Sequence, residues 1–210
     1  MSETVNYDEF EHNLRVSLGM MLIKPDALDA GIAIELIDHT YGKLKEKVLD
    51  VEAVGAVLIS SFNEEAVDRI YPDLEDNYKE AFKVFYKQGP LIVVFWGSES
   101  GKTDLWDLLR TIRGKITEGH GLEDSIRSII PLPGHKEKYN EMTKKLETGN
   151  LEAEDYIELC KSLVHIPENI KEFSGLFLSI DESEIRDIFG PTKALELKTK
   201  FEDILTIRHE

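Results

Sequence analysis

A glycine- and lysine-containing loop is the first segment of this sequence whose residue types suggest chemistry. Residues 97–103 read GSESGKT and follow an apolar run. Backbone N–H groups that precede a helix attract phosphate, so loops of this kind bind nucleotides in many proteins. Such a loop has four residues between its glycines, whereas three separate Gly97 from Gly101. The spacing favours an ordinary strand-to-helix turn. A P-loop kinase centred on Lys102, with GLFLSID ending at Asp181 as its magnesium-holding strand, is the alternative.

A second group of polar residues is scattered along the chain and suits phosphate chemistry. Arginine holds phosphate oxygens through a planar fork of N–H groups, and lysine follows them as a compact charge. A neutral imidazole is a nucleophile that can accept a phosphoryl group. Taken singly, a histidine in an apolar strand is usually a core residue, and arginines in an acidic protein are usually surface ion-pair partners. The group comprises Lys24 in IKPD, Tyr71 in IYPDL, Tyr78, Arg110, Arg127 in SIRS and His165 in SLVH.

Composition limits what the chain can bind. Its 210 residues include 41 acidic and 25 basic side chains, a formal charge of −16. A field of this sign repels polyanions, so we expect no nucleic-acid partner, and a small anionic substrate would need a local basic cluster. The single cysteine, Cys160, allows no internal disulfide, and the acidic N-terminus and short apolar runs predict neither a leader nor a membrane span. We therefore expect a cytoplasmic protein.

The pattern of apolar residues predicts the elements that must position these side chains. Continuous apolar or β-branched runs predict strands, and three- and four-residue spacing predicts amphipathic helices. The alternation predicts an α/β sandwich, with one sheet covered by helices. Strands are expected at 18–23, 51–61, 90–96 and 162–166, and helices at 30–47, 64–71, 77–87, 103–110 and 193–205.

The remaining segments suggest additions to a single domain. Residues 1–17 are expected to be a solvated N-terminal extension, and the lysine- and glutamate-rich stretch 135–161 predicts one or two exposed helices inserted before the last strand. Residues 175–180 fit either a strand or a helix. The domain is therefore expected to span residues 18–180, with a C-terminal helical extension at 181–210.

Together, the order and spacing of these motifs resemble the nucleoside diphosphate kinase family. That family opens with a strand ending in IKPDG, here IKPDA, and continues to a Tyr-x-Asp-Leu turn, here at Tyr71. Its SGP before an apolar strand ending in Trp is matched by QGP and Trp96. An arginine four residues before a glycine, and another thirteen after it, are matched by Arg110 and Arg127; the TIRG of residues 111–114 looks closer by letters, but its spacing is wrong. His165 ends an apolar triplet, as the family's active histidine does.

The resemblance implies a fold, an activity and a site. The fold would be a ferredoxin-like α/β sandwich with an antiparallel sheet. The activity would be transfer of the γ-phosphoryl of a nucleoside triphosphate to a nucleoside diphosphate through phosphorylated His165, with Mg²⁺ held mainly by the nucleotide's phosphates, in a homo-oligomer. By position, the catalytic residues would be His165 and Lys24, and the nucleotide site would comprise Lys24, Tyr71, Arg110 and Arg127 at the phosphates, Tyr78 at the base, and Thr117 and Ser162.

The surroundings of the histidine depart from the family's pattern. Ile166 and Pro167 stand where the family has Gly-Ser, and no glutamate follows eleven residues after His165. An imidazole without an orienting partner can adopt the wrong tautomer, so Glu168 and Glu172 are left as possible substitutes. A catalytically weak nucleotide-binding or scaffold module of the same fold is therefore the second hypothesis. His135 is the alternative nucleophile if the chain threads differently.

Overall fold

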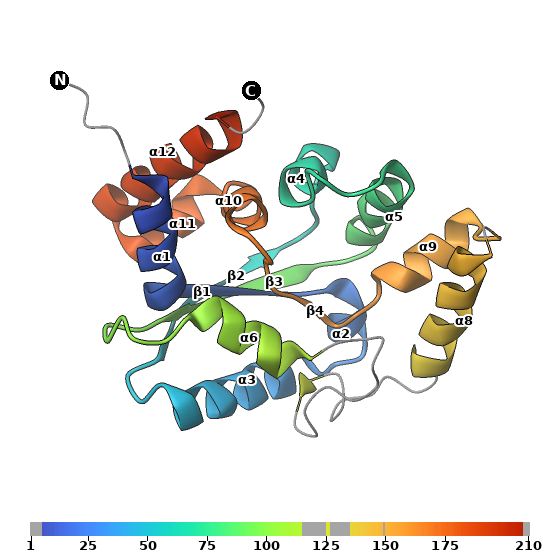
Figure 1. Cartoon of the computed structure of the whole chain (residues 1–210), viewed down its shortest axis with the longest axis horizontal. Coiled ribbons are helices and arrows are strands. Elements are labelled where there is room, and N and C mark those ends of the chain that lie inside the picture. Colours follow the sequence, from blue (N-terminus) through green and yellow to red (C-terminus); the bar gives the residue numbers. More distant parts are fainter. Residues whose placement is uncertain (1–5, 115–124, 127–134, 149, 208–210) are drawn as a thin grey trace.

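The centre of the molecule is a four-stranded antiparallel sheet (Figure 1). This computed structural model describes residues 6–114, 125–126, 135–148 and 150–207. The strands are β1 (Leu18–Ile23), β2 (Glu52–Ile59), β3 (Leu91–Gly97) and β4 (Val164–His165), in the order β2-β3-β1-β4. All neighbouring pairs are antiparallel. The expected antiparallel α/β sandwich is confirmed.

Burial explains which strands the sequence reveals most clearly. β1 and β3 lie in the middle of the sheet, and all six residues of β1 are buried. A strand covered on both faces reads as a continuous apolar run, as LGMMLI and LIVVFW do. β4 is shorter than expected, because Leu163 has a backbone φ of 65° on one side and Pro167, which has no N–H, follows on the other.

Helices cover both faces of the sheet. α3 and α6 lie on one face, and α4, α5 and α10 lie on the other (Figure 1). Residues 175–177, which fitted strand or helix, belong to α10. Across the described residues, no helix is long and apolar enough to cross a membrane. The helices are α1 (Tyr7–Ser17), α2 (Pro25–Asp29), α3 (Ala33–Lys47), α4 (Glu64–Ile70), α5 (Asp76–Tyr86), α6 (Leu105–Arg113), α8 (His135–Glu147), α9 (Ala153–Cys160), α10 (Ile170–Phe177), α11 (Glu182–Phe189) and α12 (Pro191–Ile207).

The N-terminal segment is a packed helix rather than the solvated lead-in we expected. Asn6 caps α1 by accepting a hydrogen bond from the Glu9 backbone N–H. Phe10 and Leu14 are one turn apart and therefore share a face of the helix. Leu14 is buried, and the Phe10 ring lies 5.9 Å from that of Phe201 in α12. The acidic composition of residues 1–17 concealed this apolar pair.

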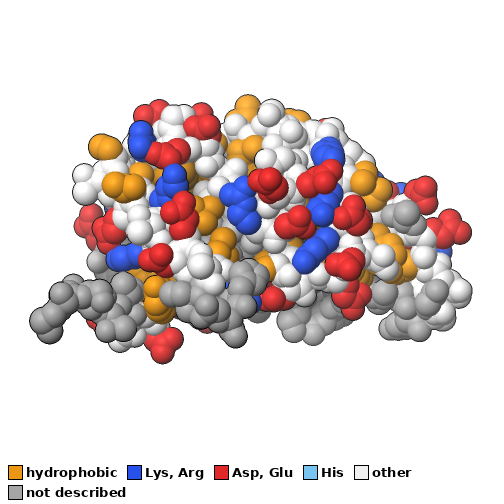
Figure 2. All heavy atoms as spheres, turned by 90° about the horizontal axis from the view of Figure 1, so that it is seen from above, with side chains coloured by type: hydrophobic (Ala, Val, Ile, Leu, Met, Phe, Trp, Pro, Cys, Tyr) orange, Lys and Arg blue, Asp and Glu red, His pale blue; other side chains and the backbone are white. Residues whose placement is uncertain are grey.

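The segment 135–161 forms two helices, α8 and α9, at the end of the molecule opposite α1 and α12 (Figure 1). Within this hairpin, the Lys145 ammonium lies 2.8 Å from an Asp155 carboxylate oxygen, and Lys138 lies 3.3 Å from Glu158. On the face that carries α4, α10 and α12, basic side chains lie among acidic ones (Figure 2). Lys83 with Asp68 and Lys171 with Asp73 are pairs of this kind, at 3.2 and 3.3 Å.

Candidate active site

His165 lies on the edge strand β4, where it pairs with Leu22 of β1. Its side chain is mostly buried, with 10% of its area exposed. The edge of the imidazole meets the ring of Tyr71, with 5.1 Å between the ring centroids. Its Nε2 lies 3.4 Å from Oε2 of Glu172. The chain threads through β4 as expected, and the side chain of His135, the alternative nucleophile, lies outside the part of the chain that the structure describes.

Glu172 supplies the orienting carboxylate that the sequence left open. It lies on α10, seven residues after His165, and the early start of this helix at Ile170, capped by Asn169, brings its first turn over the imidazole. Oε2 also accepts a hydrogen bond of 2.9 Å from the Glu168 N–H. Burial raises the pKa of Glu172 to about 7. An ionised Glu172 carboxylate beside the imidazole favours the tautomer with hydrogen on Nε2.

Lys24 directly follows β1 and points inward. The residue is 3% exposed, and its ammonium donates hydrogen bonds of 2.8 Å to the Cys160 carbonyl oxygen and to Oγ of Ser162. The ammonium also lies 5.1 Å from the centroid of the Phe82 ring, a cation–π distance. The structure thus brings together Lys24 and Ser162, two predicted site residues, as hydrogen-bond partners of one another.

Leu163, between Ser162 and β4, fixes the path of the chain into the site. Its φ of 65° lies in the left-handed region, which is unusual for a residue with a β-carbon. The Leu163 N–H donates to the Asp26 carboxylate at 2.9 Å, and its carbonyl accepts from the Lys24 N–H at 2.8 Å. The start of α2 therefore holds the chain just before His165.

The Tyr71 hydroxyl is engaged within the protein. We expected its hydroxyl to contact phosphate, but this hydroxyl shares a hydrogen bond of 2.8 Å with that of Tyr86. Both hydroxyls are buried, and burial raises the pKa of both phenols well above the usual value. The Tyr71 ring stacks on Phe82 at 4.5 Å between centroids. Tyr71 therefore forms part of an aromatic cluster between Lys24 and His165.

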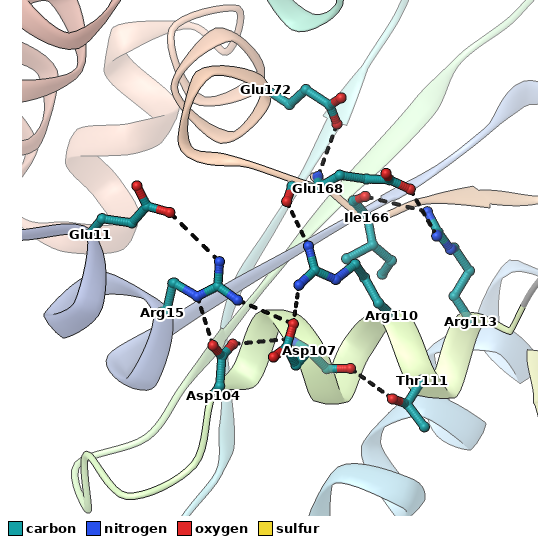
Figure 3. A network of polar contacts seen from close by, with 10 residues as sticks. All are labelled: Glu11, Arg15, Asp104, Asp107, Arg110, Thr111, Arg113, Ile166, Glu168 and Glu172. Carbon is teal, nitrogen blue, oxygen red and sulfur yellow. Dashed lines mark hydrogen bonds and ion pairs between the residues drawn. The ribbon is translucent and has the colours of Figure 1, made fainter. Parts of the chain in front are cut away.

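Two arginines of α6 reach the segment that follows His165 (Figure 3). Arg110 donates a hydrogen bond of 2.6 Å to the Glu168 carbonyl and contacts the Asp107 carboxylate. Arg113 lies 3.1 Å from the Glu168 carboxylate and donates to the Ile166 carbonyl at 3.5 Å. Sequence reasoning missed Arg113, which belongs to the TIRG that was set aside. Its spacing of three residues from Arg110, which places both on one face of the helix, is the signal that could have found it.

The remaining predicted residues have three different outcomes. Tyr78 is half-buried on α5, and its ring meets that of Tyr156 in α9 edge to face, with 5.0 Å between centroids. Thr117 and Arg127 lie outside the described residues. Ser162 is buried against Lys24, as described above.

The P-loop alternative is wrong, because an internal carboxylate occupies the loop. Oδ2 of Asp50 accepts hydrogen bonds from the Glu99 and Ser100 backbone N–H groups, at 2.8 and 2.6 Å, and from the Ser98 hydroxyl at 3.0 Å. These are donors that a phosphate would need. The segment GLFLSID, expected to be the metal-holding strand, lies instead on α10 and the turn after it.

Comparison with known proteins finds the likeness in structure alone. No family model and no curated protein matches the sequence. A nucleoside diphosphate kinase family protein from Babesia bovis superposes with a TM-score of 0.53 at 12% identity, covering 80% of this chain and 90% of that one. A transition-state mimic of the nucleoside diphosphate kinase from Borrelia burgdorferi, with bound vanadate and ADP, gives a TM-score of 0.54 at 15% identity, covering 80% and 88%.

The chain has the nucleoside diphosphate kinase fold. The expected resemblance to this family is confirmed at the level of the fold. At identities this low the nucleoside diphosphate kinase likeness does not assign the reaction, which is argued below from the residues themselves.

Proposed function

We propose that this protein is a nucleoside diphosphate kinase that transfers the γ-phosphoryl group of a nucleoside triphosphate to His165 and then to a nucleoside diphosphate. The observation that carries the proposal is the distance of 3.4 Å between Nε2 of His165 and the Glu172 carboxylate. At this ion-pair distance an ionised carboxylate favours hydrogen on Nε2, which makes Nδ1 the nitrogen that would attack phosphorus. A nucleophile oriented by a base is the arrangement that covalent catalysis needs.

Each half of the reaction forms one bond and breaks one. Nδ1 attacks the γ-phosphorus in line, the bond from that phosphorus to the β,γ-bridging oxygen breaks, and the diphosphate leaves. The second diphosphate then attacks phosphohistidine with its terminal oxygen and restores the neutral imidazole. Glu172 stabilises the positive charge that the ring develops.

The cationic groups near His165 would have to exchange partners on nucleotide binding. The Lys24 ammonium and the Arg110 guanidinium bond to protein oxygens in the structure. Phosphate oxygens would offer both groups a full negative charge in place of the neutral carbonyl and hydroxyl oxygens that they now bond. In the described part of the chain, no three His, Cys, Asp or Glu side chains are placed to hold a metal ion. We propose that Mg²⁺ would arrive on the nucleotide, where it would neutralise charge on the phosphates.

Labelling with [γ-³²P]ATP and Mg²⁺ tests the proposal. We expect label on the wild type that is lost in acid and kept in alkali, and that moves to any nucleoside diphosphate added as a chase. His165→Ala should remove the label. His12→Ala, on the exposed face of α1, is the matched control and should keep it. Equal labelling of wild type and His165→Ala would refute the proposal.

The internal hydrogen bonds of Lys24 and Arg110 favour a second candidate, a module that binds nucleotide without transferring phosphate. In this case ADP binding would be measurable by calorimetry, but no label would appear on the protein. The same two assays therefore distinguish the candidates.

A further inference from the structure

The inserted hairpin α8–α9 is docked on two groups that the proposed function assigns to the nucleotide. Tyr156 of α9 presses its ring against that of Tyr78, with an interplanar angle of 88°, and its hydroxyl accepts a hydrogen bond of 3.5 Å from the Asn77 side chain. Cys160, the last residue of α9, offers its carbonyl to the Lys24 ammonium. The hairpin thus contacts both Tyr78, expected at the base, and Lys24, expected at the phosphates.

The contact between Tyr78 and Tyr156 leaves no room for a base stacked between the two rings. A base inserted between parallel aromatic faces separates them by about twice the van der Waals thickness of a ring, whereas stacked or edge-to-face rings have centroids about 4.5–7 Å apart when in direct contact. The centroids of Tyr78 and Tyr156 are 5.0 Å apart. On this side of Tyr78, nucleobase and Tyr156 are alternative occupants.

Internal contacts hold the two helices of the hairpin together as one unit. Lys145–Asp155 and Lys138–Glu158 tie α8 to α9. Glu152 and Asp155 form a capping box that satisfies the first turn of α9. The chain beyond α9 passes through Lys161 and Ser162 to Leu163, whose N–H donates to Asp26 and whose carbonyl accepts from the Lys24 N–H. Leu163 is therefore an anchored point, and a displacement of the hairpin would take place on the α9 side of it.

We propose that α8–α9 is a cap that competes with the nucleotide for Tyr78 and Lys24, and that Tyr156 sets how tightly the cap is closed. This inference rests on the proposed function, because it takes the base to stack on Tyr78. The protein binds nucleotide in proportion to the fraction of molecules with the cap lifted, so weakening the cap strengthens binding. If the Tyr156 ring served stability alone, its removal would weaken nucleotide binding or leave it unchanged.

The test compares ADP binding by calorimetry and hydrogen exchange of the peptide 153–160 in four proteins: wild type, Tyr156→Ala, Tyr156→Phe and Lys138→Ala. Loss of an edge-to-face contact should make Tyr156→Ala bind ADP about two- to tenfold more tightly, while its melting temperature falls.

Tyr156→Phe, which keeps the ring, should bind like wild type. Lys138→Ala, which removes an exposed ion pair inside the hairpin, is the matched control for altered helix stability. In wild type, ADP should speed exchange in 153–160. If Tyr156→Ala does not fold, Tyr156→Leu serves in its place.

Each result decides the matter. Weaker or unchanged ADP binding by Tyr156→Ala, or protection of 153–160 by ADP, overturns the cap and leaves the proposed kinase standing. Tighter binding by Lys138→Ala to the same degree also overturns it, because the effect would then come from general loosening. If no variant binds ADP, the proposed function fails, and the cap with it.

Discussion

Replacing Glu172 by glutamine should make the protein more stable above neutral pH and slower to phosphorylate His165. Burial raises the pKa of this carboxyl from the usual 4.5 to about 7. The folded protein therefore binds the Glu172 proton more tightly than the unfolded chain does. The free energy of unfolding therefore falls as pH rises from 4.5 towards 7, because the buried Glu172 carboxyl must ionise in the folded protein. Above pH 7 the full cost of this ionisation is present. Glutamine has the same shape and never ionises, so the variant avoids that cost.

The size of the effect follows from the two pKa values. One pKa unit corresponds to about 1.4 kcal/mol, so a rise from 4.5 to about 7 amounts to at most about 3 kcal/mol. The glutamine oxygen can still accept the hydrogen bond that the Glu168 N–H donates at 2.9 Å. The tautomer of His165 is less well defined beside a neutral amide, so labelling should slow by about 10- to 100-fold, the range known for removing the carboxylate partner of a metal-binding histidine.

Urea unfolding at pH values between 4.5 and 8.5 measures the free energy of unfolding of wild type and of Glu172→Gln. The contributions of titrating groups that the two proteins share cancel in the difference. The advantage of the variant should be near zero at pH 4.5 and should grow until about pH 7. The rate of labelling should rise with pH through about 7 in wild type and rise less steeply in Glu172→Gln, which lacks the ionisation of residue 172. An advantage that does not grow with pH, or a variant less stable at pH 8.5, would refute the reasoning.

Three further outcomes are expected. Gly175→Ala should lower the free energy of unfolding by about 3 kcal/mol or more, measured by urea denaturation, because a β-carbon at 175 would lie 2.0 Å from the Arg69 carbonyl oxygen. Lys102→Ala should leave nucleotide binding unchanged in calorimetry, because the loop around it holds the Asp50 carboxylate; loss of binding would revive the P-loop. Asp50→Ala should speed hydrogen exchange at Ser100, whose N–H loses its acceptor, and unchanged exchange would contradict this account.

The sheet was predictable because its central strands are buried on both faces. LGMMLI and LIVVFW have no competing interpretation of similar length, and their order with the helices between them fixes an α/β sandwich. The two-residue β4 was harder to delimit. SLVHI looks like a five-residue strand, but the bend at Leu163 depends on Asp26, which is more than a hundred residues away.

The side-chain partners of the site residues could not be predicted, because they depend on tertiary packing and not on the spacing of motifs in the sequence. The resemblance led us to look for a glutamate eleven residues after His165, whereas the early start of α10 places Glu172 there after seven. Tyr71 matches the family's motif, but nothing in the local sequence shows that Tyr86, at the end of α5, takes its hydroxyl. The charge-rich residues 135–161 predict exposed helices and hide the ring of Tyr156, which contacts Tyr78 of α5.

Leu163 also determines how freely the insertion can change in length. Its left-handed backbone, which costs roughly 1 to 3 kcal/mol, is maintained by hydrogen bonds from both of its peptide groups to the segment around Pro25. Adding or removing a residue between Leu163 and His165 would break those bonds and turn the imidazole to the opposite side of the sheet, since successive residues of a strand alternate. By contrast, Thr148, Asn150 and Glu152, which lie between α8 and α9, hydrogen-bond to residues of the hairpin. The far end of α8–α9 is therefore a site where segments can be trimmed or grafted while the register of His165 is kept.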